Sequence, residues 1–214
     1  MASSIDTLKS AISNHGGIAH PNRFNVIFTP PKMSLLNKNP ANLIGNLASG
    51  SLSLRNLIND PRDISLLCQS ISIPGRNLST LDYQAGKGSR KQPYTFVDYE
   101  VTMSFLLTSD FYIKTMFDTW LENIFDIENY YVGYKKDYAT DVTIQQLNKK
   151  NIPVYGVRLV NAFPTTVTDI SLDNSSADTV QKMSATFSYD RFVAEDALSS
   201  TIGAGMRTLK NLLG

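Results

Sequence analysis

The sequence has little of what metal binding and catalysis need, since its 214 residues include one cysteine and two histidines. The single cysteine, Cys68, excludes a disulfide framework and a cysteine zinc site. Both histidines, His15 and His20, lie close to the N-terminus. A Ser-His-Asp triad or a histidine metal site would therefore depend on this N-terminal segment alone.

Charge and long apolar runs are also scarce. Charged residues make up 18% of the chain, and 20 basic and 19 acidic residues leave a formal net charge of +1. This balance disfavours a protein that grips nucleic acid through a basic face. No apolar run is long enough to span a membrane, and Met1–Gly17 lacks the apolar region of a signal peptide. We therefore expect no membrane binding by this chain alone, and synthesis in a reducing cytoplasm.

Neutral polar residues take the place of charge, because Ser, Thr and Asn together account for 56 residues. Many occupy alternate positions between apolar residues, which predicts strands with one buried and one polar face. The clearest example starts at Val97 and alternates as far as Leu107. Strands are predicted at residues 22–28, 64–72, 97–107, 140–148, 153–161, 165–172 and 179–192, with a corner at Phe163-Pro164.

A helix is predicted from Ser109 or Asp110, as the N-cap, to about Phe125. Its apolar residues recur every three or four positions, as in a helix that buries one side. Four aromatic or aliphatic residues are expected in the core: Phe117, Trp120, Ile124 and Phe187. Together these elements predict a mainly β fold, a two-sheet antiparallel sandwich or half-barrel with one flanking α-helix.

Additional segments surround this domain, which we place at residues 21–193. Residues 1–20 are predicted to form an N-terminal arm, and residues 32–62 an insertion with its own partner surface. Residues 194–214 are predicted to form an amphipathic C-terminal helix. Glycines and a proline predict a long basic loop within residues 73–93.

Opposite charges are concentrated in two segments. Residues 76–92 have a net charge of +3, and residues 110–128 have a net charge of −4. We expect the two segments to meet across an interface, where complementary charge sets orientation and register more than affinity. The candidate interface residues are Arg76, Lys87, Arg90, Lys91, Asp118 and Glu122.

No segment matches a catalytic motif. The AGKGSRK stretch at residues 85–91 lacks the first glycine and the hydroxyl residue of a phosphate loop, so we interpret it as a basic loop. Cys68 has no histidine near it in sequence, which favours a buried structural thiol over a nucleophile. A ligand-binding barrel and a hydrolase stay open as alternatives, although polar strand faces disfavour the first and the scarcity of bases disfavours the second.

Five segments follow one another in a recognisable order. They are CQSISIPGRNLST (68–80), YTFVDYEVTMSFLLTSDFYIKTMFDTWLENIF (94–125), YYVGYKKDYATDVTIQQLN (130–148), VYGVRLVNAFPTTVTDISLD (154–173) and VQKMSATFSYDRF (180–192). This series resembles the tail tube proteins of contractile-tailed, T4-like bacteriophages (myoviruses). The likeness covers about residues 20–192.

The resemblance implies a structural virion protein without enzymatic activity or cofactor. Six copies would form a ring whose inner sheets join into one β-barrel, and stacked rings would form the tube that delivers DNA inside a contractile sheath. The implied partners are other copies of the chain, the sheath protein, the tape measure protein and transiting DNA, the baseplate initiator and the tail terminator. The tube would be assembled in the host cytoplasm and belong to the virion tail. A baseplate tube-initiator ring and the tube of a phage-derived contractile injection system stay open as alternatives.

By the same analogy, the polar faces of two strands are candidates for the lining of the lumen. A neutral hydroxyl-rich wall lets DNA slide, because each phosphate contact would add salt-dependent affinity. The loop at residues 76–92 would contact neighbouring subunits or rings. The lumen candidates are Asp98, Glu100, Thr102 and Ser104 on one strand, and Lys182, Ser184, Thr186 and Ser188 on the other.

Overall fold

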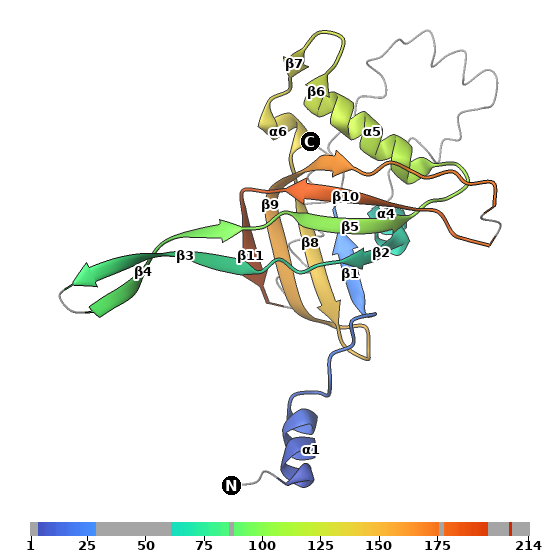
Figure 1. The fold of residues 1–214 in the computed structure, drawn as a ribbon. Helices are drawn as coiled ribbons and strands as arrows, with labels where there is room; N and C mark the ends of the chain where they lie inside the picture. The colour runs from blue at the N-terminus through green and yellow to red at the C-terminus, as the bar shows by residue number, and fades with distance from the viewer. Residues whose placement is uncertain (1–3, 29–60, 86–87, 176–177, 197–205, 207–214) are drawn as a thin grey trace.

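An antiparallel sheet that bends into two halves forms the body of the protein (Figure 1). The computed structural model describes residues 4–28, 61–85, 88–175, 178–196 and 206. One half contains β1 (Phe24–Ile27), β8 (Thr140–Leu147), the first part of β9 (Pro153–Val167) and β11 (Arg191–Glu195). The other contains the second part of β9, then β10 (Lys182–Ser188), β5 (Val101–Leu106) and β2 (Cys68–Ile71). The predicted mainly β, two-sheet fold is therefore confirmed, with sheets that do not close into a barrel.

The bend lies where β9 passes from one half to the other. β9 pairs with β11 as far as Val160 and with β8 as far as Ala162, and it pairs with β10 from Phe163 onward. Asn161 adopts a left-handed backbone conformation with a φ of 53°, and its Nδ2 donates to Asp190 Oδ2 at 2.7 Å. Asp190, between β10 and β11, donates its backbone N–H to Val160 O at 3.0 Å. Both strand paths therefore turn at the same level.

The predicted division into two strands at a Phe163-Pro164 corner is wrong, because β9 runs through both residues and its bend lies just before them, at Asn161 and Ala162. Pro164 cannot donate a backbone hydrogen bond, and the register of β10 shifts opposite it, between Thr186 and Phe187. The strand predicted at residues 179–192 is one path that the bend divides into β10 and β11.

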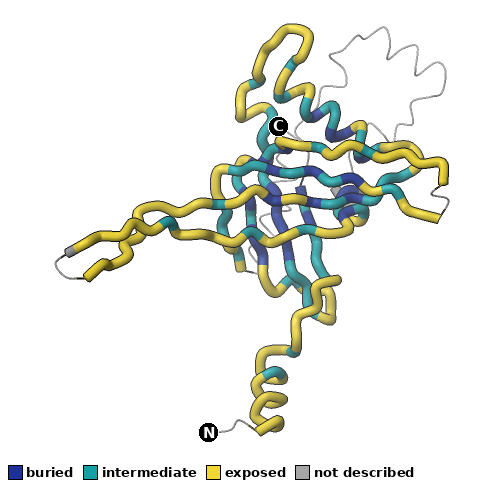
Figure 2. The backbone as a smooth tube through the Cα atoms, viewed as in Figure 1, coloured by how far each residue is buried: buried dark blue, intermediate teal, exposed yellow. Residues whose placement is uncertain are grey.

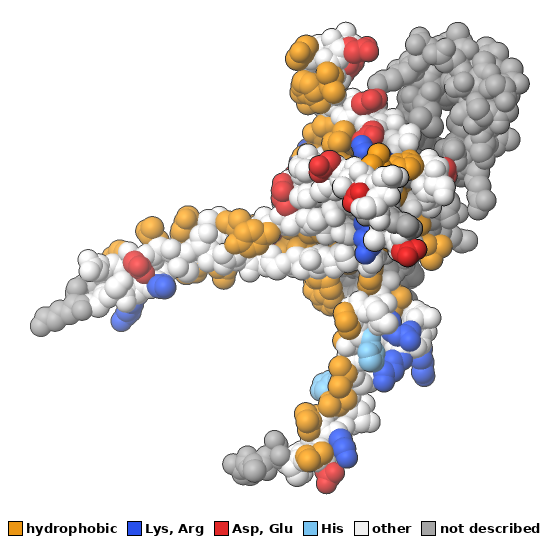
Figure 3. Space-filling view, turned by 45° about the vertical axis from the view of Figure 1, so that its right-hand side comes forward, with side chains coloured by type: hydrophobic (Ala, Val, Ile, Leu, Met, Phe, Trp, Pro, Cys, Tyr) orange, Lys and Arg blue, Asp and Glu red, His pale blue; other side chains and the backbone are white. Residues whose placement is uncertain are grey.

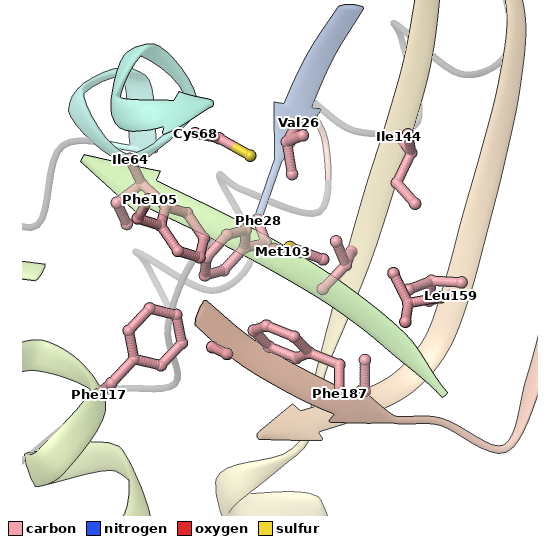
Figure 4. Close-up of a cluster of buried hydrophobic side chains, with 14 of the residues drawn as sticks. Val26, Phe28, Ile64, Cys68, Met103, Phe105, Phe117, Ile144, Leu159 and Phe187 are labelled. Carbon is pink, nitrogen blue, oxygen red and sulfur yellow. The ribbon is translucent and has the colours of Figure 1, made fainter. Parts of the chain in front are cut away.

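Aromatic side chains fill the space between the two halves of the sheet and the neighbouring helix (Figure 4 shows several of them). Phe117 and Phe187 meet edge to face with ring centroids 5.8 Å apart. Trp120 stacks on Phe117 at 6.1 Å and contacts the edge of Phe187 at 5.9 Å. Phe28 lies 6.0 Å from Phe187. All four rings are fully buried, so contacts between the sheet and the helix hold the core together.

The predicted helix is present as α5 (Tyr112–Ile124), with the predicted apolar stripe facing the core and Ile124 half-buried at its end. The N-cap is Phe111 instead of Ser109 or Asp110, although Asp110 accepts the Tyr112 backbone N–H at 3.3 Å. The chain then forms β6 (Phe125–Asp126), β7 (Tyr131–Val132) and α6 (Lys135–Tyr138).

Two predicted strands have different boundaries in the structure. Residues 61–67 form α4 (Pro61–Leu67), so that β2 begins only at Cys68. The strand predicted from Val97 is interrupted after Asp98 and resumes at Val101. Val97 and Tyr99 are exposed, whereas Val101 is buried. The alternation of polar and apolar residues keeps its phase across this break, so the sequence pattern does not reveal it.

A β-hairpin occupies the segment that was predicted as a long loop. β3 (Arg76–Ala85) and β4 (Gly88–Asp98) pair along their whole length and project from the body, with nearly all their residues exposed (Figure 2). Gly88 lies at the tip, and Pro93 lies beside a register shift between Ser79 and Thr80. Glycine and proline, the residue types that suggested a loop, therefore lie at the turn and at an irregularity of the hairpin, where strands accommodate them.

The two ends of the chain are described only in part. Residues of the predicted arm form α1 (Ile5–Asn14), which has no buried residue and extends away from the body (Figure 1). Glu195 belongs to β11, where it accepts a hydrogen bond from Arg158 Nε at 2.6 Å, and does not start a helix. The predicted insertion and C-terminal helix otherwise lie almost entirely outside the described residues. Within the described part of the chain, every helix is too short or too polar to cross a membrane.

We expect Phe187→Ala to lower the free energy of unfolding by about 3–5 kcal/mol, because it removes a buried ring from the aromatic cluster. Urea unfolding followed by the fluorescence of Trp120, the only tryptophan, measures the change. Tyr94→Ala is the control, since Tyr94 is 67% exposed and its loss should change the free energy by less than about 0.5 kcal/mol. Equal effects of the two substitutions would contradict the core assignment.

Candidate functional site

Hydroxyl groups form a row across the outer face of β5 and β10, opposite the face that lines the core. Thr102 and Thr186 are direct cross-strand partners with their hydroxyl oxygens 3.2 Å apart. Ser104 and Ser184 are partners in the same way at 2.9 Å. Between these pairs, Met103 points to the other face and is fully buried. The structure thus brings together four of the eight residues that the sequence predicts for the lumen.

The hydroxyl row continues onto both neighbouring strands. In β2, Ser70 is the partner of Ser104, and in β9, Thr166 is the partner of Thr186. Partners in an antiparallel sheet share a face, so these groups extend the row across all four strands. Lys182 is exposed at the start of β10, and Ser188 is half-buried at its end. We define the hydroxyl row as Ser70, Thr102, Ser104, Thr166, Ser184 and Thr186.

Asp98 and Glu100 do not belong to this row, although the sequence places them on the same strand face. Asp98 ends β4 and pairs with Arg76, whose Nε lies 3.4 Å from Asp98 Oδ1. Only 9% of the Asp98 side chain is exposed. Glu100 is exposed in the interruption between β4 and β5. The break in the predicted strand therefore separates the carboxylates from the hydroxyl groups.

The half of the sheet that carries the hydroxyl row has two outer strands. Its strand order places β2 at one side and residues 163–167 of β9 at the other. Among the described residues, β2 pairs only with β5, and β8 does not pair with β9 beyond Ala162. An outer strand presents backbone N–H and C=O groups that can pair with another chain. Both sides of this half are therefore suited to extension by further strands.

The hairpin carries exposed apolar side chains on both of its faces, which the described part of the body does not cover (Figure 3). A two-stranded hairpin is only marginally stable by itself in water. Large exposed apolar patches mark surfaces that contact other molecules. This hairpin is therefore best suited to packing against a partner. Its most exposed apolar residues are Leu78, Leu81, Tyr83, Tyr94 and Phe96, each more than half exposed.

The structure divides the predicted charged interface residues into two groups. Arg90 and Lys91 lie near the tip of the hairpin, opposite Tyr83 and Asp82, and Lys87 lies outside the described residues. Arg76 lies at the base and is paired with Asp98 of its own chain. On α5, Asp118 forms an ion pair with Lys114, one turn earlier, and Glu122 is exposed. The hairpin tip points away from α5, so the two charged segments do not meet within one chain (Figure 1).

An aromatic turn beside α5 was not predicted as a surface. Between β6 and β7, Asp126 accepts hydrogen bonds from the backbone N–H groups of Glu128 and Asn129 at 2.9 and 3.3 Å. This turn holds Ile127 and Tyr130 in the open, 69% and 81% exposed. The run of tyrosines is visible in the sequence. Its exposure depends on the direction in which the β6–β7 pair extends from the end of α5.

The described residues show little that catalysis or metal binding requires. Burial raises the pKa of the Cys68 thiol to about 12, and Cys68 Sγ lies 3.7 Å from Ser70 O. A thiol with so high a pKa is a poor nucleophile at neutral pH. In the described part of the chain, no three His, Cys, Asp or Glu side chains are grouped to hold a metal ion.

Comparison with known proteins gives one family and several structural relatives. A family model described as "Phage tail tube protein" matches residues 19–195. The chain is similar to a chain in the 6-fold symmetrised baseplate of the anti-feeding prophage, with a TM-score of 0.56 and 15% identity over 84% of this chain and 97% of that chain. It is also similar to a chain in the sheath–tube complex of the extracellular contractile injection system PVC, with a TM-score of 0.54 and 17% identity over 91% and 99% of the two chains. At such identities the structures show the fold alone, and no curated protein sequence matches.

We expect Cys68 to resist alkylation in the folded protein. With a pKa of about 12 in place of 9.0, its thiolate fraction at pH 8 should be about a thousandfold lower than that of an ordinary thiol. Iodoacetamide labelling followed by mass spectrometry tests this on the folded and the urea-unfolded chain. A Ser89→Cys variant, with its thiol on the exposed hairpin, is the internal control and should label rapidly at residue 89 only. Comparable labelling of both cysteines would contradict the burial of Cys68.

Proposed function

Because the chain belongs to the phage tail tube protein family, we propose that it is the repeating subunit of a tail tube, in which six copies form a ring and rings stack. The observation that carries this proposal is the family match over residues 19–195, which includes both halves of the sheet, α5 and the hairpin. The protein then acts as a structural part of the virion and not as an enzyme.

The two outer strands of the half sheet support ring formation. If β2 of one copy pairs with the β9 edge of the next, the half sheets of six copies join into one continuous barrel. The hydroxyl row then lies on one face of every copy, at the same height in the ring. The opposite face is occupied by the core, so the hydroxyl face is the one that lines the lumen in this proposal.

A lumen lined by the hydroxyl row suits the passage of DNA. Neutral hydroxyl groups bind phosphates weakly, whereas lysine and arginine contacts would each hold the DNA and add salt dependence. We assign Thr102, Ser104, Ser184 and Thr186 to the wall, with Lys182 and Ser188 at the ends of β10. Asp98 is left out of the wall because it is committed to Arg76.

The proposed partners follow from this architecture. A contractile sheath surrounds the tube, the tape measure protein and then DNA occupy the lumen, and an initiator and a terminator bind its two ends. One similar structure comes from a sheath–tube complex, which supports the sheath as partner. We place the assembled protein in the virion tail, after assembly in the host cytoplasm.

Two further assignments have specific support. The similarity to a chain of the anti-feeding prophage baseplate favours a baseplate initiator ring as the second candidate. The similarity to a chain of the PVC sheath–tube complex favours the tube of a phage-derived injection particle as the third. Copy number separates the initiator from either kind of tube, since an initiator forms a single ring per particle and a tube contains many rings.

Electron microscopy of the purified chain tests the proposal directly. Negative-stain images over a range of protein concentrations should show rings with six-fold symmetry or long hollow tubes. Class averages give the symmetry, and quantitative mass spectrometry of whole particles gives the copy number. A chain that stays monomeric at every concentration contradicts the proposed function.

Charge reversal at the hairpin tip tests the predicted contact between the hairpin and α5 of another copy. Arg90→Glu combined with Lys91→Glu should raise the critical concentration of tube assembly about tenfold, and Glu122→Lys in the same chain should restore part of the loss. Lys149→Glu combined with Lys150→Glu is the matched control, because these lysines are exposed in the turn between β8 and β9. Tubes of normal length from the Arg90 and Lys91 variant would show that the contact does not exist.

A further inference from the structure

Arg76 lies at the centre of a cluster that joins the hairpin to the body. Its guanidinium carbon is 5.1 Å from the ring centroid of Phe96 in β4 and 4.5 Å from that of Phe192 in β11. Arg76 Nη2 donates to Phe192 O at 3.3 Å. Arg76 Nε lies 3.4 Å from Asp98 Oδ1. A single side chain therefore contacts both the hairpin and a strand of the body.

A second contact joins the hairpin to the bend in the sheet. Tyr189, between β10 and β11, donates its hydroxyl hydrogen to Tyr99 O at 2.6 Å. Asn77 Nδ2, at the start of β3, donates to the Tyr99 hydroxyl at 3.2 Å. Burial and the Asp98 carboxylate raise the pKa of Tyr189, so its hydroxyl keeps the proton that this bond requires. We call Arg76, Asp98, Tyr99, Tyr189 and Phe192 the clasp.

The clasp is costly as well as stabilising. Asp98 Oδ2 is buried and has no hydrogen-bond partner among the described residues. An unsatisfied buried oxygen opposes folding, so a residue chosen for stability alone would not be a carboxylate here. The carboxylate does help to hold Arg76 beside the rings of Phe96 and Phe192, since it offers the guanidinium Nε an acceptor. The Arg76–Asp98 pair therefore contributes more to the orientation of the hairpin than to the stability of the fold.

Among the described residues, the rest of the hairpin has no comparable support from the body. From Leu78 to Gln84, every residue of β3 except Ser79 is exposed, and in β4 only Asp98 is not exposed. An arm that is held only at its base swings about that base unless the base is rigid. Arg76 limits such rotation because its guanidinium contacts one ring of the hairpin and one ring of the body.

We propose that Arg76 is a positioning residue that fixes the direction of the hairpin before copies of the chain meet. The inference rests on the proposed function, because the hairpin is taken to pack on another copy. A hairpin already held in the direction of its partner loses less conformational freedom on assembly, and association becomes more favourable. Its position in the basic segment 76–92 suggested that Arg76 contributes charge to the interface. In this proposal Arg76 acts instead by orienting the hairpin.

Hydrogen–deuterium exchange of the unassembled chain, kept below its critical concentration, tests the positioning role. Arg76→Ala should speed exchange of the β3 and β4 amides about tenfold while leaving β5 and β10 unchanged. Arg76→Lys keeps the charge but loses the guanidinium group, so it should show the same change if the guanidinium contacts with the two rings set the direction. The matched control is Arg23→Ala, which removes one exposed hydrogen bond to Asn151 at 2.8 Å, far from the hairpin.

Assembly is measured on the same variants by sedimentation. Arg76→Ala and Arg76→Lys should raise the critical concentration about tenfold, and Arg23→Ala should not. Unchanged exchange in the hairpin, faster exchange throughout the body, or a normal critical concentration despite a loosened hairpin would each overturn the positioning role. If the unsubstituted chain forms no ring or tube, the proposed function fails, and the exchange data still decide whether Arg76 orients the hairpin.

Discussion

The bend at Asn161 and Asp190 is the constraint on which the rest of the structure depends. Because β9 and the β10–β11 path turn at the same level, one antiparallel sheet supplies both walls of the core. Inward-facing residues such as Phe187 meet the aromatic cluster, and the residues between them face outward as the hydroxyl row. The same bend carries Tyr189, which holds the base of the hairpin. Core, polar face and projecting arm therefore have a common structural origin.

The sequence predicts those parts of the fold in which burial follows a regular period. In α5 the apolar residues recur at helical spacing, and in β5 and β10 they alternate, so the buried face is visible in the sequence. The hairpin does not follow this rule because its apolar residues are exposed in the single chain. The join of α4 and β2 is hidden for a different reason, since a short apolar run does not distinguish a helical turn from a strand.

The sequence predicts those features of the candidate site that depend on the alternation within a single strand. That Ser104 and Ser184 face outward follows from alternation, but their hydroxyl contact depends on the register of strands far apart in sequence. Asp98 has the same alternation as Thr102 and Ser104 in the sequence. It does not join the hydroxyl row, because the pairing of the hairpin strands brings Arg76 opposite Asp98. Counting charges likewise assigned Arg76 to an interface, although its charge is matched within its own chain. The positions of Asp98 and Arg76 both depend on strand pairing between segments that are separated in sequence, and a local sequence pattern does not reveal such pairing.

The low net charge of the chain makes the geometry of the hairpin important for assembly. A net charge of +1 gives copies of the chain little mutual repulsion, so net charge does not prevent wrong contacts, and shape and direction have to contribute to specificity. In the proposed tube, the hairpin and the surface that receives it are different parts of the molecule, which makes their contact heterologous. Heterologous contacts close into a ring only at one rotation between copies and otherwise continue as an open filament. The angle at which the hairpin leaves the body is therefore as important as its apolar surface, and this angle is set at its base by Arg76 and by the bend behind it.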